Sequence, residues 1–169
     1  VGCGGVGLNS VQGAAIAGAG TIVAVDLAGD KLEAARGFGA THTVNPKKED
    51  AAKAIKAITH GRGVDFVFVT VGAKAAFDRA FDYITKNGTV VIVGMPPSGV
   101  MAEYDPGTVA AWNQKILGSK MGETRVATDI PELVELYRAG RLKLDELITA
   151  RYPLERINEA IAEVNAGKA

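Results

Sequence analysis

The sequence predicts an α/β fold in which parallel strands are covered by helices on both faces. Three observations support this prediction. Short apolar runs alternate with helical patterns as far as about residue 95, an order that is typical of a parallel sheet. The run 21–25 is continuously apolar, as expected for a strand buried on both faces. The chain also opens with the glycine-rich turn VGCGGVG, which is typical of the passage from such a strand into its helix.

Size and composition exclude several classes of protein. The chain has 169 residues, enough for a domain with a substantial core. Its 19 basic and 19 acidic residues give no net charge, so nothing favours binding to nucleic acid or to an anionic membrane. The sequence contains no run of 18 apolar residues, so it predicts no membrane span. The single cysteine excludes an internal disulfide framework and fits a reducing compartment, so we expect a cytoplasmic protein.

Residues 1–7 match the pattern G-x-G-x-x-G, with Gly2, Gly4 and Gly7 in the glycine places. The first glycine permits a tight turn, the second lets a pyrophosphate approach the backbone, and the third allows close helix packing. The helix that follows directs free N–H groups toward the phosphates. The pattern therefore indicates a dinucleotide site.

Only Val1 precedes this turn, although a strand of about five residues normally does. That strand is central in a doubly wound sheet. We therefore expect a Rossmann-type doubly wound parallel sheet whose first strand is largely missing, and a chain that is part of a longer polypeptide.

The helices and strands up to residue 93 are predicted from hydrophobic periodicity and from the glycine and turn residues that end each element. Small residues at 5–19 predict a helix that lies close on the sheet, and Gly39 and Gly63 end two later helical patterns. The dipeptide Asn87-Gly88 predicts a turn before the last run. The expected strands are 21–25, 41–44, 64–69 and 89–93, and the expected helices are 5–19, 30–38, 49–59 and 73–85.

The pattern changes after residue 95. We expect a short extended piece at 100–104, a helical turn or two at 106–112 and a strand at 115–119. A helix is predicted from Asp129 to Ala139, because Asp129 or Thr128 can cap it and Pro131 falls in its first turn. Residues 147–152 are expected to be extended and 154–164 to form an amphipathic helix.

Asp26 ends the apolar run 21–25 and lies 19 residues after Gly7. At this place a carboxylate can accept hydrogen bonds from both ribose hydroxyls of the adenosine half, and it would repel a 2′-phosphate. The residue therefore favours NAD over NADP. The alternative is an aspartate that only caps a helix or a turn.

Two further turns follow strands in the same way, at residues 70–72 and 94–95. Ligands of parallel sheets bind beyond the carboxyl ends of the strands. The glycine turn, Asp26 and these two turns should therefore meet at one edge.

With these residues placed, the sequence closely resembles the coenzyme-binding half of the zinc-dependent alcohol dehydrogenases, in the medium-chain dehydrogenase/reductase superfamily. The matching stretches are GCGGVG, AVDLAGDKLEAARGFGATHTVNP, GVDFVFVTVG, GTVVIVGMPP, KILGSKMG and LDELITARYPLERINEAI. The resemblance implies hydride transfer between a primary alcohol or aldehyde and NAD.

The resemblance also implies roles for single residues. Gly4, Gly5 and Val6 would bind the pyrophosphate, with Val6 also lining the nicotinamide, and Lys31 would join Asp26 at the ribose. The full expected set of cofactor-binding residues is Gly2, Gly4, Gly5, Val6, Gly7, Asp26, Lys31, Val71, Gly72, Val93, Gly94, Met95, Ser119 and Met121.

The catalytic zinc of the family lies in an upstream domain that these residues do not match. Cys3, His42 and His60 share no ligand spacing, so we assign no metal ligand and no catalytic residue here. Residues 1–122 are expected to form the NAD-binding domain, and residues 123–169 a segment that packs on the absent catalytic domain. We expect 1–169 alone to be inactive.

Three alternatives stay open at this point. A zinc-free quinone reductase of the same superfamily would prefer NADPH, a regulatory domain would bind NAD without chemistry, and a methyltransferase also uses a glycine turn followed by an acid. The family's edge strand corresponds to residues 100–104, which predicts a homodimer through that strand.

Overall fold

The computed structural model describes residues 1–167, and the chain divides into two compact units. The first unit spans Val1–Arg125 and the second begins at Val126. Each unit is described by itself. Residues 168–169, the end of the predicted segment 123–169, lie outside the described residues.

The strands of the first unit are all parallel but form two separate sheets. β1 (Val23–Val25) pairs with β2 (His42–Val44), while β4 (Ile84–Ile92) lies between β3 (Val64–Val69) and β5 (Lys115–Gly118). The predicted α/β class with parallel strands is confirmed. The doubly wound sheet is present in two parallel pieces, because β1 and β3, between which the largely missing first strand was expected, are not paired with each other.

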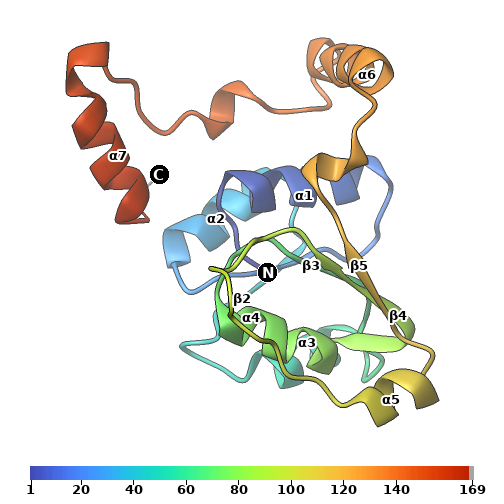
Figure 1. Ribbon diagram of the computed structural model, residues 1–169. Coiled ribbons are helices and arrows are strands. Elements are labelled where there is room, and N and C mark those ends of the chain that lie inside the picture. Colours follow the sequence, from blue (N-terminus) through green and yellow to red (C-terminus); the bar gives the residue numbers. More distant parts are fainter. Residues whose placement is uncertain (168–169) are drawn as a thin grey trace. The chain divides into compact units, whose positions relative to one another are not determined.

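Helices cover both sides of these strands (Figure 1). α1 (Gly5–Ile16) and α2 (Gly29–Gly37) lie on one side, and α3 (Ala51–Ile58) and α4 (Lys74–Arg79) lie on the other. The Asp50 side chain accepts a hydrogen bond from the backbone N–H of Lys53 and so caps α3. The short helix α5 (Pro106–Ala111) precedes β5.

One predicted helix, 73–85, extends too far. α4 ends at Arg79, a single 3₁₀ turn spans Ala80–Asp82, and β4 already begins at Ile84. Tertiary contacts decide this boundary, since Ile84 pairs with Val64 and is buried in the core. The predicted turn at Asn87-Gly88 survives as an irregularity inside β4, with Asn87 at a φ of 61°.

Residues 100–104 pair with no other strand within residues 1–167, and their expected pairing with a second copy stays a prediction. The segment is held instead by α4, where the backbone N–H of Glu103 donates to Asp78 Oδ1 over 2.9 Å and Lys74 forms an ion pair with Asp78 over 2.7 Å.

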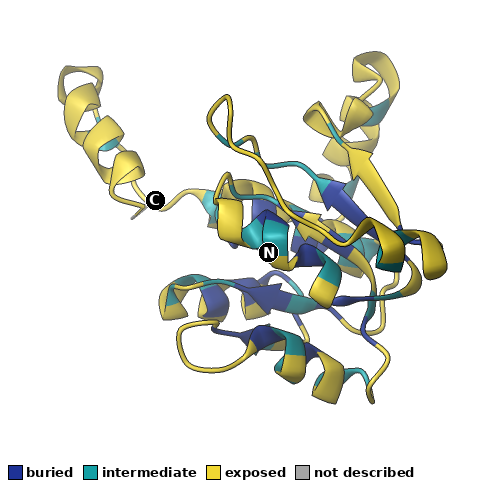
Figure 2. Ribbon diagram, turned by 60° about the horizontal axis from the view of Figure 1, so that its bottom comes forward, coloured by how far each residue is buried: buried dark blue, intermediate teal, exposed yellow. Residues whose placement is uncertain are grey.

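The core of the first unit lies between the strands and the α3–α4 side. Val44 and Val69 are its most deeply buried large side chains, and Ile55, Phe77 and Tyr83 pack with them from the helical side. Figure 2 shows the buried residues in β1–β4 and in the neighbouring helices, whereas all of β5 is exposed. Each such side chain contributes about 1.5–3 kcal/mol through burial.

The second unit contains α6 (Val126–Arg138) and α7 (Ile157–Asn165). The predicted start of α6 at Asp129 is wrong by three residues, so that Pro131 lies inside the helix. Gly140, at a φ of 68°, follows its end. Neither helix has a residue coloured as buried (Figure 2). Apolar residues are exposed in both helices. Within residues 1–167, no helix is both long and apolar enough to cross a membrane.

Candidate functional site

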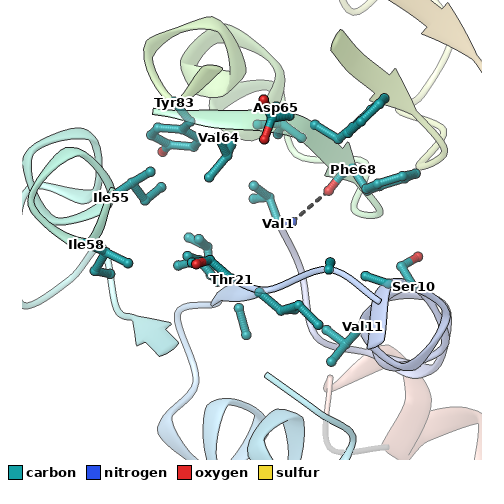
Figure 3. A pocket seen from close by; sticks show the side chains of 18 of the residues that line it. Val1, Ser10, Val11, Thr21, Ile55, Ile58, Val64, Asp65, Phe68 and Tyr83 are labelled. Carbon is teal, nitrogen blue, oxygen red and sulfur yellow. Dashed lines mark hydrogen bonds between the residues drawn. The ribbon is translucent and has the colours of Figure 1, made fainter. Parts of the chain in front are cut away.

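The first two residues connect the two sheets. The Val1 amino group donates to the Phe68 carbonyl over 2.7 Å (Figure 3), and the Gly2 N–H donates to the Val25 carbonyl over 2.8 Å. Val1 therefore stands between β1 and β3, where a central strand would end.

Gly2 and Gly7 are glycines for steric reasons that the structure makes explicit. Gly2 has a φ of 92°, and a Cβ on it would collide with the Val71 side chain. A Cβ on Gly7 would collide with the backbone carbonyl of Gly2. The third glycine of the motif thus lets α1 pack against the turn itself, rather than only against the sheet.

Gly4 and Gly5 have a different environment. A Cβ on either residue would meet no atom within 4 Å. They precede and begin α1, whose first turn has no acidic residue and no side-chain cap, and the next side chain, Val6, is 56% exposed. Free N–H groups at the start of a 12-residue helix, with open space before them, fit a phosphate group.

Thr70 holds the turn in place and was not among the predicted site residues. Its hydroxyl lies 3.0 Å from the Val1 carbonyl and 2.9 Å from the Gly2 carbonyl, and these two oxygens share its one donor hydrogen. The Thr70 N–H donates to the Val1 carbonyl over 3.0 Å. The sequence signal was its place directly after β3, at the strand edge already expected to bind the ligand.

We expect Thr70→Val to lower the free energy of unfolding by about 1–2 kcal/mol, because two turn carbonyls lose their hydroxyl donor. Thr70→Ser keeps the hydroxyl and should lose less than half as much. Urea unfolding of the two variants measures the difference. Equal losses would assign the effect to the methyl group instead.

Asp26 lies at the end of β1 and contacts the glycine turn directly. Its Oδ2 accepts the N–H of Cys3 over 2.7 Å, and its Oδ1 accepts the N–H of Ala28 over 2.9 Å. The carboxylate therefore bridges the turn and the approach to α2. The structure shows this turn-stabilising role, and the half-buried carboxylate remains partly open to a ligand.

The Cys3 thiol is buried beneath the turn, 3.9 Å from the Val25 carbonyl. Burial, with a further contribution from the Asp26 carboxylate, raises its pKa to about 11. The thiol is therefore protonated near neutral pH, which makes it a poor nucleophile and a poor metal ligand.

This pKa predicts a loss of stability in alkali. The unfolded chain releases the Cys3 proton near pH 9, whereas the folded chain keeps it until about pH 11. The stabilisation is complete below pH 9 and is lost as the pH rises to 11. We expect the unsubstituted chain to lose more unfolding free energy between pH 8 and 10.5 than Cys3→Ala. Parallel pH profiles would contradict the assignment.

The turns after β3 and β4 pack tightly on each other. The N–H groups of Val93 and Gly94 donate to the Val69 carbonyl over 3.0 and 2.8 Å. A Cβ on Gly72 would lie 2.6 Å from the Met95 carbonyl, and one on Gly94 would collide with the backbone of Val71. Glycine is needed at both positions because the two backbones touch.

The remaining predicted residues are placed less closely. The Ser119 N–H donates to the Ile92 carbonyl over 2.9 Å, which sets Ser119 beside the end of β4. Lys31 is half-buried in α2. Met95 and Met121 extend into solvent, 88% and 86% exposed. The structure thus brings together the glycine turn, Asp26 and the two later turns. The side chains of Met95 and Met121 do not pack against these residues.

No three His, Cys, Asp or Glu residues within 1–167 are grouped so as to hold a metal ion. The Cys3 thiol is buried and protonated, so it is poorly suited to bind a metal ion. The described residues therefore do not fit a zinc ion, and no step through zinc follows from them.

Comparison with known proteins identifies relatives for most of the chain. The family described as zinc-binding dehydrogenase matches residues 5–139. The NDMA-dependent alcohol dehydrogenase of Amycolatopsis methanolica is 40% identical over 170 residues, which cover 99% of this chain and 46% of that protein.

Solved structures of similar proteins match the fold of this chain. An alcohol dehydrogenase zinc-binding domain protein from Burkholderia ambifaria matches with a TM-score of 0.93 and 40% identity, covering 98% of this chain and 44% of its own. A zinc-binding dehydrogenase from Sinorhizobium meliloti 1021 bound to NADP matches with a TM-score of 0.84 and 28% identity, over 95% and 46%. The chain spans less than half the length of the relatives it matches.

Proposed function

Because this chain belongs to the zinc-binding dehydrogenase family, we propose that it is the NAD-binding part of an alcohol dehydrogenase. The observation that carries the proposal is the cluster at one strand edge. There the open backbone at Gly4 and Gly5 adjoins the start of α1, and the Asp26 carboxylate contacts the same turn.

These residues suit different parts of a dinucleotide. Uncapped N–H groups of α1 would hold the pyrophosphate, and Asp26, with Lys31, would hold the adenosine ribose. The turns 70–72 and 94–95, together with Val6 and Ser119, would border the rest of the cofactor. When bound, the nicotinamide supplies the hydride acceptor, and this chain positions it.

The alcohol or aldehyde pocket and the catalytic zinc would then belong to a separate domain, as would the proton relay. The segment from residue 123 would pack on that domain. Four of its apolar side chains, Leu133, Tyr137, Ile148 and Ile157, are 39–48% exposed, which is consistent with an absent partner surface. Residues 100–104 would pair with their copy in a cytoplasmic homodimer.

The test is binding and turnover by residues 1–169. We expect calorimetry to detect NAD binding with a lower Kd than NADP, and expect no oxidation of a primary alcohol. Tighter binding of NADP would favour the zinc-free reductase alternative, since one relative is bound to NADP. No binding of either nucleotide would refute the proposal.

A further inference from the structure

Asn45 is a buried polar residue directly after the carboxyl end of β2, where it is only 8% exposed. Its neighbour Val44 pairs with Val25 of β1, and the Val44 carbonyl accepts the N–H of Asp26 over 3.3 Å. Asn45 therefore lies beside the loop that leads from β1 into α2 and carries the Asp26 carboxylate.

The two polar atoms of the Asn45 side chain bond to different loops. Its Oδ1 accepts the N–H of Lys47 over 2.9 Å, which closes a tight turn after β2. Its Nδ2 donates to the carbonyl of Leu27 over 3.3 Å, 18 residues earlier in the chain. The turn needs only an oxygen, which aspartate or serine would also supply. Of the residues that commonly form such a turn, asparagine alone adds an N–H donor, and here that donor serves Leu27.

The peptide group between Leu27 and Ala28 is held from both sides. Its carbonyl accepts the hydrogen bond from Asn45 Nδ2, and its N–H donates to Asp26 Oδ1 over 2.9 Å. The peptide is trans, so its C=O and N–H point in opposite directions. One peptide plane therefore links the Asn45 amide to the Asp26 carboxylate. Without the bond from Asn45 this plane can turn, and Asp26 then loses a fixed donor.

The acceptor positions of the Asp26 carboxylate show what this donor does. A carboxylate offers about four such positions, two on each oxygen. Oδ1 uses one for the N–H of Ala28, and Oδ2 uses one for the N–H of Cys3 over 2.7 Å. The remaining positions, one on each oxygen, equal in number the two hydroxyls of an adenosine ribose. The two backbone donors fix the rotation of the carboxylate and so set the direction of both remaining positions.

We propose that Asn45 is a positioning residue for nucleotide binding, which acts through the Leu27–Ala28 peptide to orient the Asp26 carboxylate toward the two ribose hydroxyls. This role rests on the proposed function, in which Asp26 accepts those hydroxyls and favours NAD over NADP. Asn45 acts without contacting the cofactor. Its effect arises because a carboxylate that is held in advance loses less freedom when the ribose binds.

The test compares Asn45→Ser with the unsubstituted 169-residue chain in calorimetric titrations with NAD and with NADP. Serine keeps an oxygen for the N–H of Lys47 but is too short to donate to Leu27. We expect NAD to bind about three- to ten-fold more weakly, the effect of one lost hydrogen bond, and NADP to lose less than about two-fold. The amide hydrogen of Ala28 should exchange faster relative to those of β1.

A double-mutant cycle with Asp26→Asn separates positioning from a purely structural role. If Asn45 acts through the carboxylate, Asn45→Ser should change the Kd for NAD by less than about two-fold in the Asp26→Asn background. Thr41→Val is the matched control, because the Thr41 hydroxyl joins the opposite end of the same strand pair by accepting the N–H of Ile22 over 2.8 Å. Thr41→Val should lower stability in urea but leave the Kd for NAD and the exchange of Ala28 unchanged.

Asn45→Thr also keeps a hydroxyl for the turn and takes the place of Asn45→Ser if that variant does not fold. Equal effects of Asn45→Ser in the two backgrounds, or the same change in the ratio of NAD and NADP affinities from Thr41→Val, would overturn the positioning role and leave the proposed function standing. If the unsubstituted chain bound neither nucleotide, both would be refuted.

Discussion

Replacing Gly7 by alanine should destabilise the first unit by about 3 kcal/mol and abolish measurable nucleotide binding. The added Cβ would collide with the Gly2 carbonyl. A backbone atom cannot rotate away as a flexible side chain can, so either α1 must shift or the turn must open. Opening the turn would also break the bonds that Thr70 makes to Val1 and Gly2.

Gly13→Ala is the matched control for this prediction. Gly13 lies in the same helix, is exposed, and has open space where a Cβ would be placed. Alanine there should stabilise the chain by up to about 1 kcal/mol through helix propensity. Urea unfolding and calorimetry with NAD measure both variants. If Gly7→Ala behaved like Gly13→Ala, the close packing of α1 on the turn would be refuted.

Replacing Asp26 by asparagine should weaken NAD binding by roughly ten- to a hundred-fold and reduce the preference for NAD over NADP. The carboxylate is proposed to accept the ribose hydroxyls, and its charge would repel a 2′-phosphate. Asparagine keeps one oxygen for a backbone N–H but lacks the charge and the second acceptor. The two Kd values, measured by calorimetry, give the change in preference.

The same substitution also affects the fold, because Asp26 accepts the N–H groups of Cys3 and Ala28. Unfolding measurements separate the two effects, since a purely structural role would lower stability without changing the ratio of the NAD and NADP affinities. Asp30→Asn removes an exposed charge from the first turn of α2. It should leave that ratio unchanged.

Much of the first unit could be predicted from the sequence because its signals are local. The apolar run 64–69 gave the bounds of β3 without error, and Asp105 and Pro106 mark the start of α5. The glycine turn was predicted with its steric requirement, although the partner of Gly7 was not. These features depend on residues close to each other in the chain.

Errors arose where distant residues decide the local structure. Residues 84 and 85 have a helical pattern, yet Ile84 pairs with Val64 and enters β4. No local signal indicates that the backbone N–H of Glu103 donates to Asp78 of α4, 25 residues earlier in the chain. Thr70 had an ordinary strand-end position, and only the folded chain brings its hydroxyl to Val1 and Gly2.

The sequence by itself determined the parallel α/β class, the glycine turn and the acidic residue that follows β1. The class follows from the alternation of short apolar runs and helical patterns as far as about residue 95, and the turn and the acid follow from residue spacing within 1–26. Only the tertiary structure decided that Asp26 bonds to the turn and that Thr70 fixes the turn from 68 or 69 residues away. These contacts depend on how separate strands meet, which local spacing does not specify.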